Sequence, residues 1–219
     1  MVITNLKFTR NGVRVNVYLD SVFAFSVSQK LISEYRLYQG KKLSKEKVKE
    51  IKGEDEFVRY YERVVGLLGR RPRSVGEVGE YLKRTFHKKE KEYGENLTER
   101  ILSELEKKNL LNDENFTRWW VEGRIQFKPR GRLLLRQELR QKKVSENLIQ
   151  KVFAEFSLTE ETEYKQALVL ARKRKEILNL TEKKDRDKLV SYLLRKGFSY
   201  EIIKKVLFKL INTAREFKY

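Results

Sequence analysis

Apolar and polar residues alternate along the first 27 residues of the chain, as they do in half-buried strands. The segments ITNLKFT, VRVNVYL and VFAFSVS place apolar side chains at every second position. Asn11-Gly12 suits a two-residue type I′ turn between the first two segments, and Asp20-Ser21 provides the second reversal. The pattern predicts a three-stranded meander. A sheet this small needs a helix on one face, which SQKLISEYRL would supply.

A helical period replaces the alternation further along the chain. The segment Gly40–Glu56 is highly charged and is predicted to be a short solvated helix or a connector. After it, apolar residues recur at i, i+3, i+4, i+7 and i+11, at Phe57, Tyr60, Tyr61, Val64 and Leu68. Gly69 is expected to end this helix. Ser74 with Glu77 forms a capping-box pattern that begins the next one, and Asn112 is expected to cap a later helix.

The helical part of the chain contains internal repeats. Val144–Phe156 and Phe198–Leu210 align without a gap, and the preceding LRQKKV matches LLRKGF, with YLKRTF as a looser early copy. The fourth position of these hexapeptides is basic in all three, at Arg84, Lys142 and Lys196. The helices upstream also match, so that Arg124 coincides with Arg172. These matches predict tandem three-helix units that must stack to bury enough apolar surface.

The expected fold is therefore mainly α. It is an elongated tandem array of three three-helix repeats with a small N-terminal β-meander. The predicted divisions are 1–55 for the meander and a helical connector, and 56–111, 112–157 and 158–219 for the three repeats. Phe23 and Phe25 share one strand face and are expected in the core. Trp120 has helical spacing with Phe116, which favours core packing over stacking on nucleic-acid bases.

One stretch combines a dense positive charge with a helical pattern. KPRGRLLLRQELRQKKV, residues 128–144, has seven basic residues and one acid, Glu138, and it is predicted to be helical from Arg132. Arg132, Arg136, Arg140 and Lys143 fall at i, i+4, i+8 and i+11, so they line one stripe while the leucines point toward the core. Such a stripe suits a phosphate backbone or an acidic protein surface. An ordinary solvated helix face is the alternative.

The composition of the chain also suggests a negatively charged partner. The formal net charge of +19 suggests a polyanionic partner, such as DNA, RNA or a nucleoprotein surface, although a merely soluble basic protein has the same charge. The chain has no cysteine and a single histidine, which excludes disulfides, thiolate metal sites and a zinc site built on histidines. No apolar run approaches the roughly 20 residues that span a bilayer, and the N-terminus lacks a secretory pattern. We expect a cytoplasmic protein without a membrane partner.

No catalytic motif is recognisable in the sequence. Phosphate-binding glycine loops, metal-ligand clusters and supported Ser/His/Asp arrangements are all missing. We therefore expect no enzymatic activity and no cofactor. A nuclease with carboxylates scattered along the chain is the remaining enzymatic alternative.

Four segments together resemble a known family. RPRSVGEVGEYLKR, LNDENFTRWWVEGR, KPRGRLLLRQELRQKKVSENLI and KLVSYLLRKGFSYEIIKKVL are similar, in order and spacing, to the signatures of the RecX family. They cover about Arg71 to Leu210. The resemblance implies tandem three-helix repeats and a protein that lies in the groove of the RecA–single-stranded-DNA filament. There it would limit filament growth and inhibit the ATPase, recombination and coprotease activities of RecA during DNA repair and the SOS response. One departure is Lys143, where many members have glycine.

Fourteen basic residues are candidates for contact with this partner or with DNA. They are Arg70, Arg71, Arg73, Arg124, Lys128, Arg130, Arg132, Arg136, Arg140, Lys142, Lys143, Arg172, Arg195 and Lys196. The expected partners are a RecA filament and single-stranded, and also double-stranded, DNA, bound by a monomer. The alternative is a general basic DNA-binding helical protein that acts without RecA.

Overall fold

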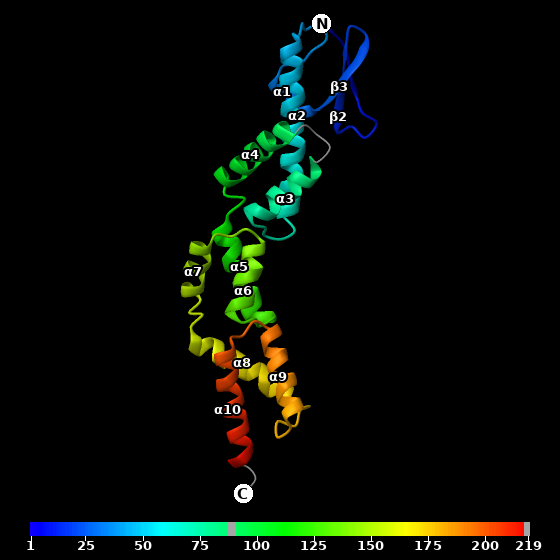
Figure 1. Cartoon of the computed structure of the whole chain (residues 1–219). Helices are drawn as coiled ribbons and strands as arrows, with labels where there is room; N and C mark the ends of the chain where they lie inside the picture. The colour runs from blue at the N-terminus through cyan, green and yellow to red at the C-terminus, as the bar shows by residue number, and fades with distance from the viewer. Residues whose placement is uncertain (87–90, 217–219) are drawn as a thin grey trace. The chain divides into compact units, whose positions relative to one another are not determined.

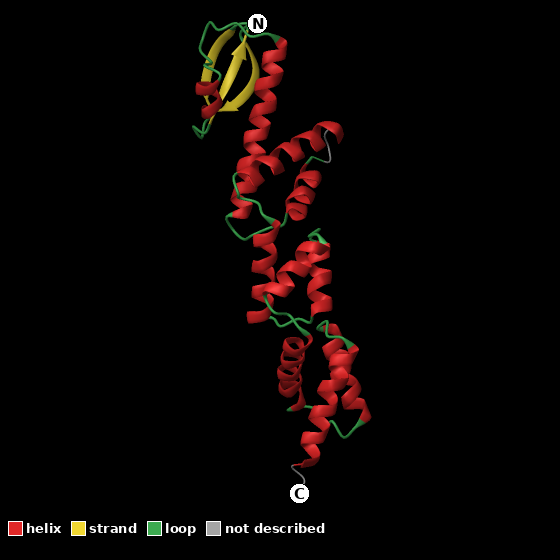
Figure 2. Cartoon of the chain, turned by 90° about the vertical axis from the view of Figure 1, so that its left-hand side faces the viewer, coloured by secondary structure: helices red, strands yellow, loops and turns green. Residues whose placement is uncertain are grey.

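The computed structural model describes residues 1–86 and 91–216. Within them the chain is mainly helical with one small N-terminal sheet, which confirms the predicted fold class (Figure 2). The strands are β1 (Ile3–Phe8), β2 (Arg14–Leu19) and β3 (Val22–Ser28). The helices are α1 (Gln29–Glu34), α2 (Lys45–Leu68), α3 (Val75–Thr85), α4 (Lys91–Lys107), α5 (Asp113–Phe127), α6 (Arg132–Gln141), α7 (Glu146–Glu155), α8 (Glu160–Lys175), α9 (Lys183–Arg195) and α10 (Tyr200–Glu216) (Figure 1).

Contacts divide the chain into two compact units. The first unit comprises Met1–Arg71 with Glu92–Glu104, and the second comprises Pro72–Lys91 with Leu105–Tyr219. The first unit therefore holds the sheet and α2, whereas α3 and the helices from α5 onward belong to the second.

The sheet is the predicted antiparallel meander, in the order β1-β2-β3, but its turns differ from the prediction. The two-residue turn lies at Asp20-Ser21, where both residues have positive φ, 48° and 69°, as a type I′ turn requires. The prediction of a type I′ turn at Asn11-Gly12 was wrong. There the loop is longer, and Thr9 donates its backbone N–H to the Arg14 carbonyl at 2.9 Å. The Asn11 carboxamide accepts from the Thr9 hydroxyl at 2.7 Å, which stabilises this wider loop.

A β-bulge in β3 explains a second wrong prediction. Val17 pairs with Phe25, and the next residue of β2, Tyr18, pairs with Phe23. One residue of β3, between these two phenylalanines, is therefore additional. The additional residue reverses the alternation of side chains. Phe25 is buried, but Phe23 is 55% exposed on the opposite face, beside Tyr18. Only one of the two phenylalanines is therefore in the core.

Helix α2 is the largest departure from the sequence prediction. The charged segment Gly40–Glu56 is neither a short helix nor a connector, because a single helix of 24 residues begins at Lys45 and ends, as predicted, before Gly69. It passes without a break through the division predicted between residues 55 and 56. Ile51 is fully buried in the core beneath the sheet, together with Leu31 of α1. This contact stabilises a helix whose own sequence is sparse in apolar residues.

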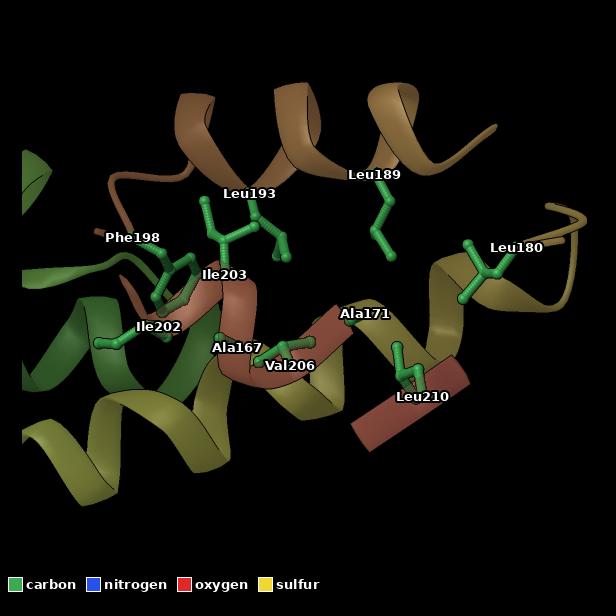
Figure 3. Packing of buried hydrophobic residues seen from close by; sticks show 10 residues of the cluster. All are labelled: Ala167, Ala171, Leu180, Leu189, Leu193, Phe198, Ile202, Ile203, Val206 and Leu210. Atoms are coloured by element: carbon green, nitrogen blue, oxygen red, sulfur yellow. The ribbon is translucent and has the colours of Figure 1, made fainter. Parts of the chain in front are cut away.

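In the second unit each three-helix group has its own apolar cluster. The cluster of α8, α9 and α10 has ten buried residues, shown in Figure 3: Ala167, Ala171, Leu180, Leu189, Leu193, Phe198, Ile202, Ile203, Val206 and Leu210. The alanines of α8 leave room for α10 to lie close. A second cluster joins α5, α6 and α7 around Phe116, Leu135 and Ile149. The predicted caps at Ser74, with its full capping box, and at Asn112 are both confirmed.

Candidate functional site

Two similar contacts, here called the first and second joint, link the middle helices of the second unit, α3, α6 and α9. In the first joint the N-terminus of α3 meets the turn after α6, and Ser74 Oγ donates to the carbonyl of Lys142 at 2.7 Å. In the second joint the N-terminus of α6 meets the turn after α9, and the N–H of Gly131 donates to the carbonyl of Lys196 at 2.8 Å. Lys142 and Lys196 are equivalent bases of the repeats. Their backbone carbonyls thus join successive three-helix groups.

The turns at both joints require an unusual backbone conformation. Lys143 has φ +62° and Gly197 has φ +87°, so the lysine adopts the left-handed conformation that glycine adopts in the equivalent place. The turn at Lys143 therefore has the same left-handed geometry as the equivalent turn at Gly197, although it has lysine in place of glycine. The backbones also lie very close. A Cβ on Gly76 would lie 2.5 Å from the Cβ of Lys143, and a Cβ on Gly131 would overlap the carbonyl of Gly197.

A carboxylate from the next three-helix group completes each joint. Asp113 of α5 accepts from the N–H of Val75, and Glu163 of α8 accepts from the N–H of Arg132, both at 2.8 Å. Each acid therefore lies at the N-terminus of a helix, where the helix dipole and free N–H groups favour negative charge. Burial raises the pKa of both carboxyls, and the backbone hydrogen bond opposes this rise. The joints thus depend on a half-buried acid, Asp113, and a buried one, Glu163, and sequence reasoning identified neither role.

Three of the predicted basic residues gather in a groove of about 390 Å³ beside the first joint: Arg73, Arg124 and Lys142. Trp120 also lines it, with the Lys142 Nζ and the Arg124 guanidinium each 4.3 Å from its ring. The Trp120 indole N–H donates to Glu138 at 2.9 Å, and Arg124 pairs with the same carboxylate at 2.8 Å. Lys142 pairs with Glu77 at 2.8 Å.

The environment of Trp120 supports the core interpretation of this residue, because the ring packs against the cluster of α5, α6 and α7. Arg124 and Lys142 are paired with carboxylates within the protein, whereas the buried Nε of Arg73 has no hydrogen-bond partner in the described part of the chain. The groove therefore holds the first joint together and carries less free charge than its sequence suggests.

The predicted arginine stripe on α6 is partly neutralised. Helix α6 begins at Arg132 as predicted, and Arg136 and Arg140 converge on Glu146, at 2.8 and 2.9 Å. Hydrogen bonds from Gln150 and then from the two arginines lower the pKa of Glu146 to about 2. Lys143 pairs with Glu80 at 2.8 Å. Two arginines share one carboxylate, so a single net positive charge remains there.

The leucines of α6 do not all point inward as predicted. Leu135 and Leu139 are buried, but Leu133 is 58% exposed. A helix only ten residues long buries one face, and Leu133 lies outside it.

The remaining candidates are spread over both units. Arg70 and Arg71 lie in the first unit, and the others lie in the second. Arg130 lies 3.9 Å from Glu138, the Arg132 guanidinium lies 5.9 Å from the Phe153 ring, and the Lys196 Nζ lies 5.5 Å from the Tyr192 ring. In the described part of the chain, four candidates are exposed and have no carboxylate partner: Arg70, Lys128, Arg172 and Arg195. These four are the bases most available to a polyanion.

Two kinds of feature are absent from the described residues. They contain no group of three or more His, Asp or Glu side chains that could hold a metal ion. None of their helices is long and apolar enough to cross a membrane. The acids at the joints accept hydrogen bonds from helix N-termini.

Comparison with protein families finds three matching domains. Residues 1–44 match the regulatory protein RecX N-terminal domain, residues 112–152 match the RecX second three-helix domain, and residues 161–207 match the RecX third three-helix domain. The last two matches fall on the helices that form the second joint.

Known proteins resemble the chain over nearly its whole length. "Regulatory protein RecX" of Clostridioides difficile is 29% identical over 93% of this chain and 92% of its own. The protein of that name from Clostridium botulinum strain Eklund 17B is 31% identical over the same shares. A crystal structure of regulatory protein RecX matches with a TM-score of 0.69 and 26% identity, covering 94% of this chain and 98% of its own. The structure from Lactobacillus salivarius, at 22% identity and a TM-score of 0.57 over 71% of this chain and 97% of its own, supports the fold alone.

Proposed function

The chain belongs to the RecX family of regulatory proteins, and we propose that it binds the RecA filament on single-stranded DNA and inhibits RecA. Inhibition would extend to filament growth, ATP hydrolysis, recombination and coprotease activity, and so to DNA repair and the SOS response. The observation that carries the proposal is family membership over nearly the full length. Exposed cations at several places along the chain support it, because a filament groove offers repeated acidic and phosphate surfaces.

The proposed contacts are weak individually and numerous. Arg70, Lys128, Arg172 and Arg195 have no carboxylate partner in the described part of the chain, so no internal ion pair must break before they bind. Several such contacts on one chain add through effective concentration. The joints would keep the spacing of the three-helix groups fixed. In this proposal the protein is a cytoplasmic monomer that acts as a regulator, without a cofactor and without catalysis.

The direct test is ATP hydrolysis by RecA on single-stranded DNA with purified protein added. We expect hydrolysis to fall as the protein is titrated, and filaments to shorten in electron micrographs. Unchanged hydrolysis at a large excess of protein would contradict the proposal.

A pair of charge reversals tests the contact residues. The double variant Arg172→Glu, Arg195→Glu removes two exposed cations and should weaken inhibition by tenfold or more. The matched control is Lys83→Glu, Lys107→Glu, which changes the net charge equally at exposed lysines outside the candidate set. If both double variants lose inhibition equally, bulk charge and not these positions accounts for the effect.

The net charge of +19 also favours the second candidate, a DNA-binding protein that needs no RecA. That function predicts tight binding to duplex DNA alone. Its affinity should fall by a log slope of about 0.9 per phosphate contact as salt rises. Weak duplex binding together with RecA inhibition at the same salt concentration would exclude it.

A further inference from the structure

The outer face of the N-terminal sheet combines exposed aromatic rings with cations. Because β2 alternates, Val15, Val17 and Leu19 are buried, and Tyr18 points to the other side of the sheet. The bulge in β3 brings Phe23 to that same side, with the two ring centroids 5.9 Å apart at an interplanar angle of 75°. Phe23, the second residue of β3, is 55% exposed, so its ring is accessible to a partner.

Polar and basic groups surround this ring pair. Lys7 of β1 lies 5.8 Å from the Tyr18 ring. Asn5 lies directly opposite Tyr18 in the sheet, and Asn16 lies opposite both Lys7 and Ser26. None of the three strands contains an Asp or Glu. The face therefore offers aromatic rings, amides and a cation, without a carboxylate to repel a polyanion.

A groove of about 1100 Å³ within the first unit borders the same face and is lined by five basic and four acidic residues. Arg14 and Ser26 line it from the sheet. Lys45, Lys49 and Lys52 line it from α2, where their spacing puts them on one side of the helix, and all three are exposed.

Three of the four acids that line this groove form ion pairs. Asp55 pairs with Arg14, Glu50 with Lys47 and Glu56 with Arg59, while Glu46 has no cation partner in the described part of the chain. The three lysines are therefore available to a second anionic group.

We infer that this sheet face and groove bind single-stranded DNA directly. Tyr18 and Phe23 stack on unpaired bases, and the lysines of α2 follow the phosphates. A positively charged groove beside aromatic side chains is the usual arrangement for single-strand binding, because every base has a face on which a ring can stack. Duplex DNA fits poorly, since its bases are already stacked on one another. The choice of DNA as the strand rests on the proposed function, whereas the binding itself requires no RecA.

The test uses the full chain without RecA and a fluorescein-labelled (dT)20 oligonucleotide, with affinity measured by anisotropy. Phe23→Ala should weaken binding about fivefold or more, within the range expected for loss of one stacking ring. Phe23→Trp should remain within twofold of the unmodified chain. The control is Phe208→Ala, which removes a 71% exposed phenylalanine from α10 and should have no effect. Since Phe23 and Phe208 are both exposed, neither truncation creates a buried cavity.

A second measurement locates the strand. Oligonucleotides carrying 5-iododeoxyuridine should cross-link to Tyr18 or Phe23 when irradiated, as mapped by mass spectrometry. The inference is overturned if Phe23→Ala binds (dT)20 within twofold of the unmodified chain, or if cross-links fall only outside residues 1–71. Equal weakening on a 20-base-pair duplex, or binding to (rU)20 but not (dT)20, would also overturn it. Because RecA is absent, failure here leaves the ATP-hydrolysis test of the proposed function untouched.

Discussion

The first joint should fail when a single methyl group is added at Gly76. This glycine lies in the first turn of α3, and a Cβ there would lie 2.5 Å from the Cβ of Lys143 and 2.7 Å from the carbonyl oxygen of Lys142. Normal contacts of these kinds are above 3 Å, and both partners belong to a fixed turn. In Gly76→Ala the turn must therefore move by roughly 1 Å relative to α3.

The magnitude follows from three contributions. Overpacking at a site that cannot relax costs about 1–3 kcal/mol. Moving the turn also breaks the 2.7 Å hydrogen bond from Ser74 Oγ to the Lys142 carbonyl, which contributes about 1 kcal/mol. Against these, alanine gains about 1 kcal/mol over glycine inside a helix. The expected net loss of unfolding free energy is about 1–3 kcal/mol, or a few °C in Tm for a chain of this size.

Gly66→Ala is the matched control. Gly66 also lies in a helix, α2, but a Cβ there meets no atom within 4 Å. It should therefore stabilise the protein by about 1 kcal/mol. Urea unfolding followed by circular dichroism measures both variants, and hydrogen exchange should show faster opening of α3 in Gly76→Ala. If Gly76→Ala proved as stable as Gly66→Ala, the close contact at the joint would be refuted.

Three further results are expected. Lys143→Gly should match or exceed the unmodified chain in stability by up to about 1 kcal/mol, because it removes a side chain from a left-handed backbone; Lys143→Val in the same urea titration should be less stable. The pKa of Glu146, about 2, lies below its ordinary value, so its ion pairs stabilise the fold above pH 4.5 and are lost as pH falls toward 2. The stability difference between the unmodified chain and Glu146→Gln should therefore shrink over that interval, and a constant difference would contradict the pairing with Arg136. Trp120→Phe keeps an aromatic ring but removes the donor to Glu138, and should cost about 1 kcal/mol in urea unfolding.

Local signals in the sequence were sufficient for many features. The capping box at Ser74, the cap at Asn112 and the helix start at Arg132 depend on residues a few positions apart, and all three are confirmed. The three-stranded meander and the predominantly helical fold followed from periodicity in the same way. Such patterns can be recognised because the backbone geometry that they satisfy is local.

Predictions failed where a residue on another helix or strand decides the outcome. Phe23 has the pattern of a core residue, but the bulge across from β2 turns it outward. The charged start of α2 lacks a strong apolar stripe, and its helix depends on burial of Ile51 beneath the sheet. The free charge of the α6 stripe could not be predicted either, because Glu146 belongs to the next helix.

The sequence by itself determined the type of most main elements, the repeats and the family, since these depend on residue order and spacing. Only the tertiary structure decided which charges remain free. An ion pair such as Lys142–Glu77 joins residues 65 positions apart, and the joint from Ser74 to Lys142 spans 68. Periodicity places a base on a helix face, but Coulomb attraction depends on distance in space, and that distance exists only once the helices have packed.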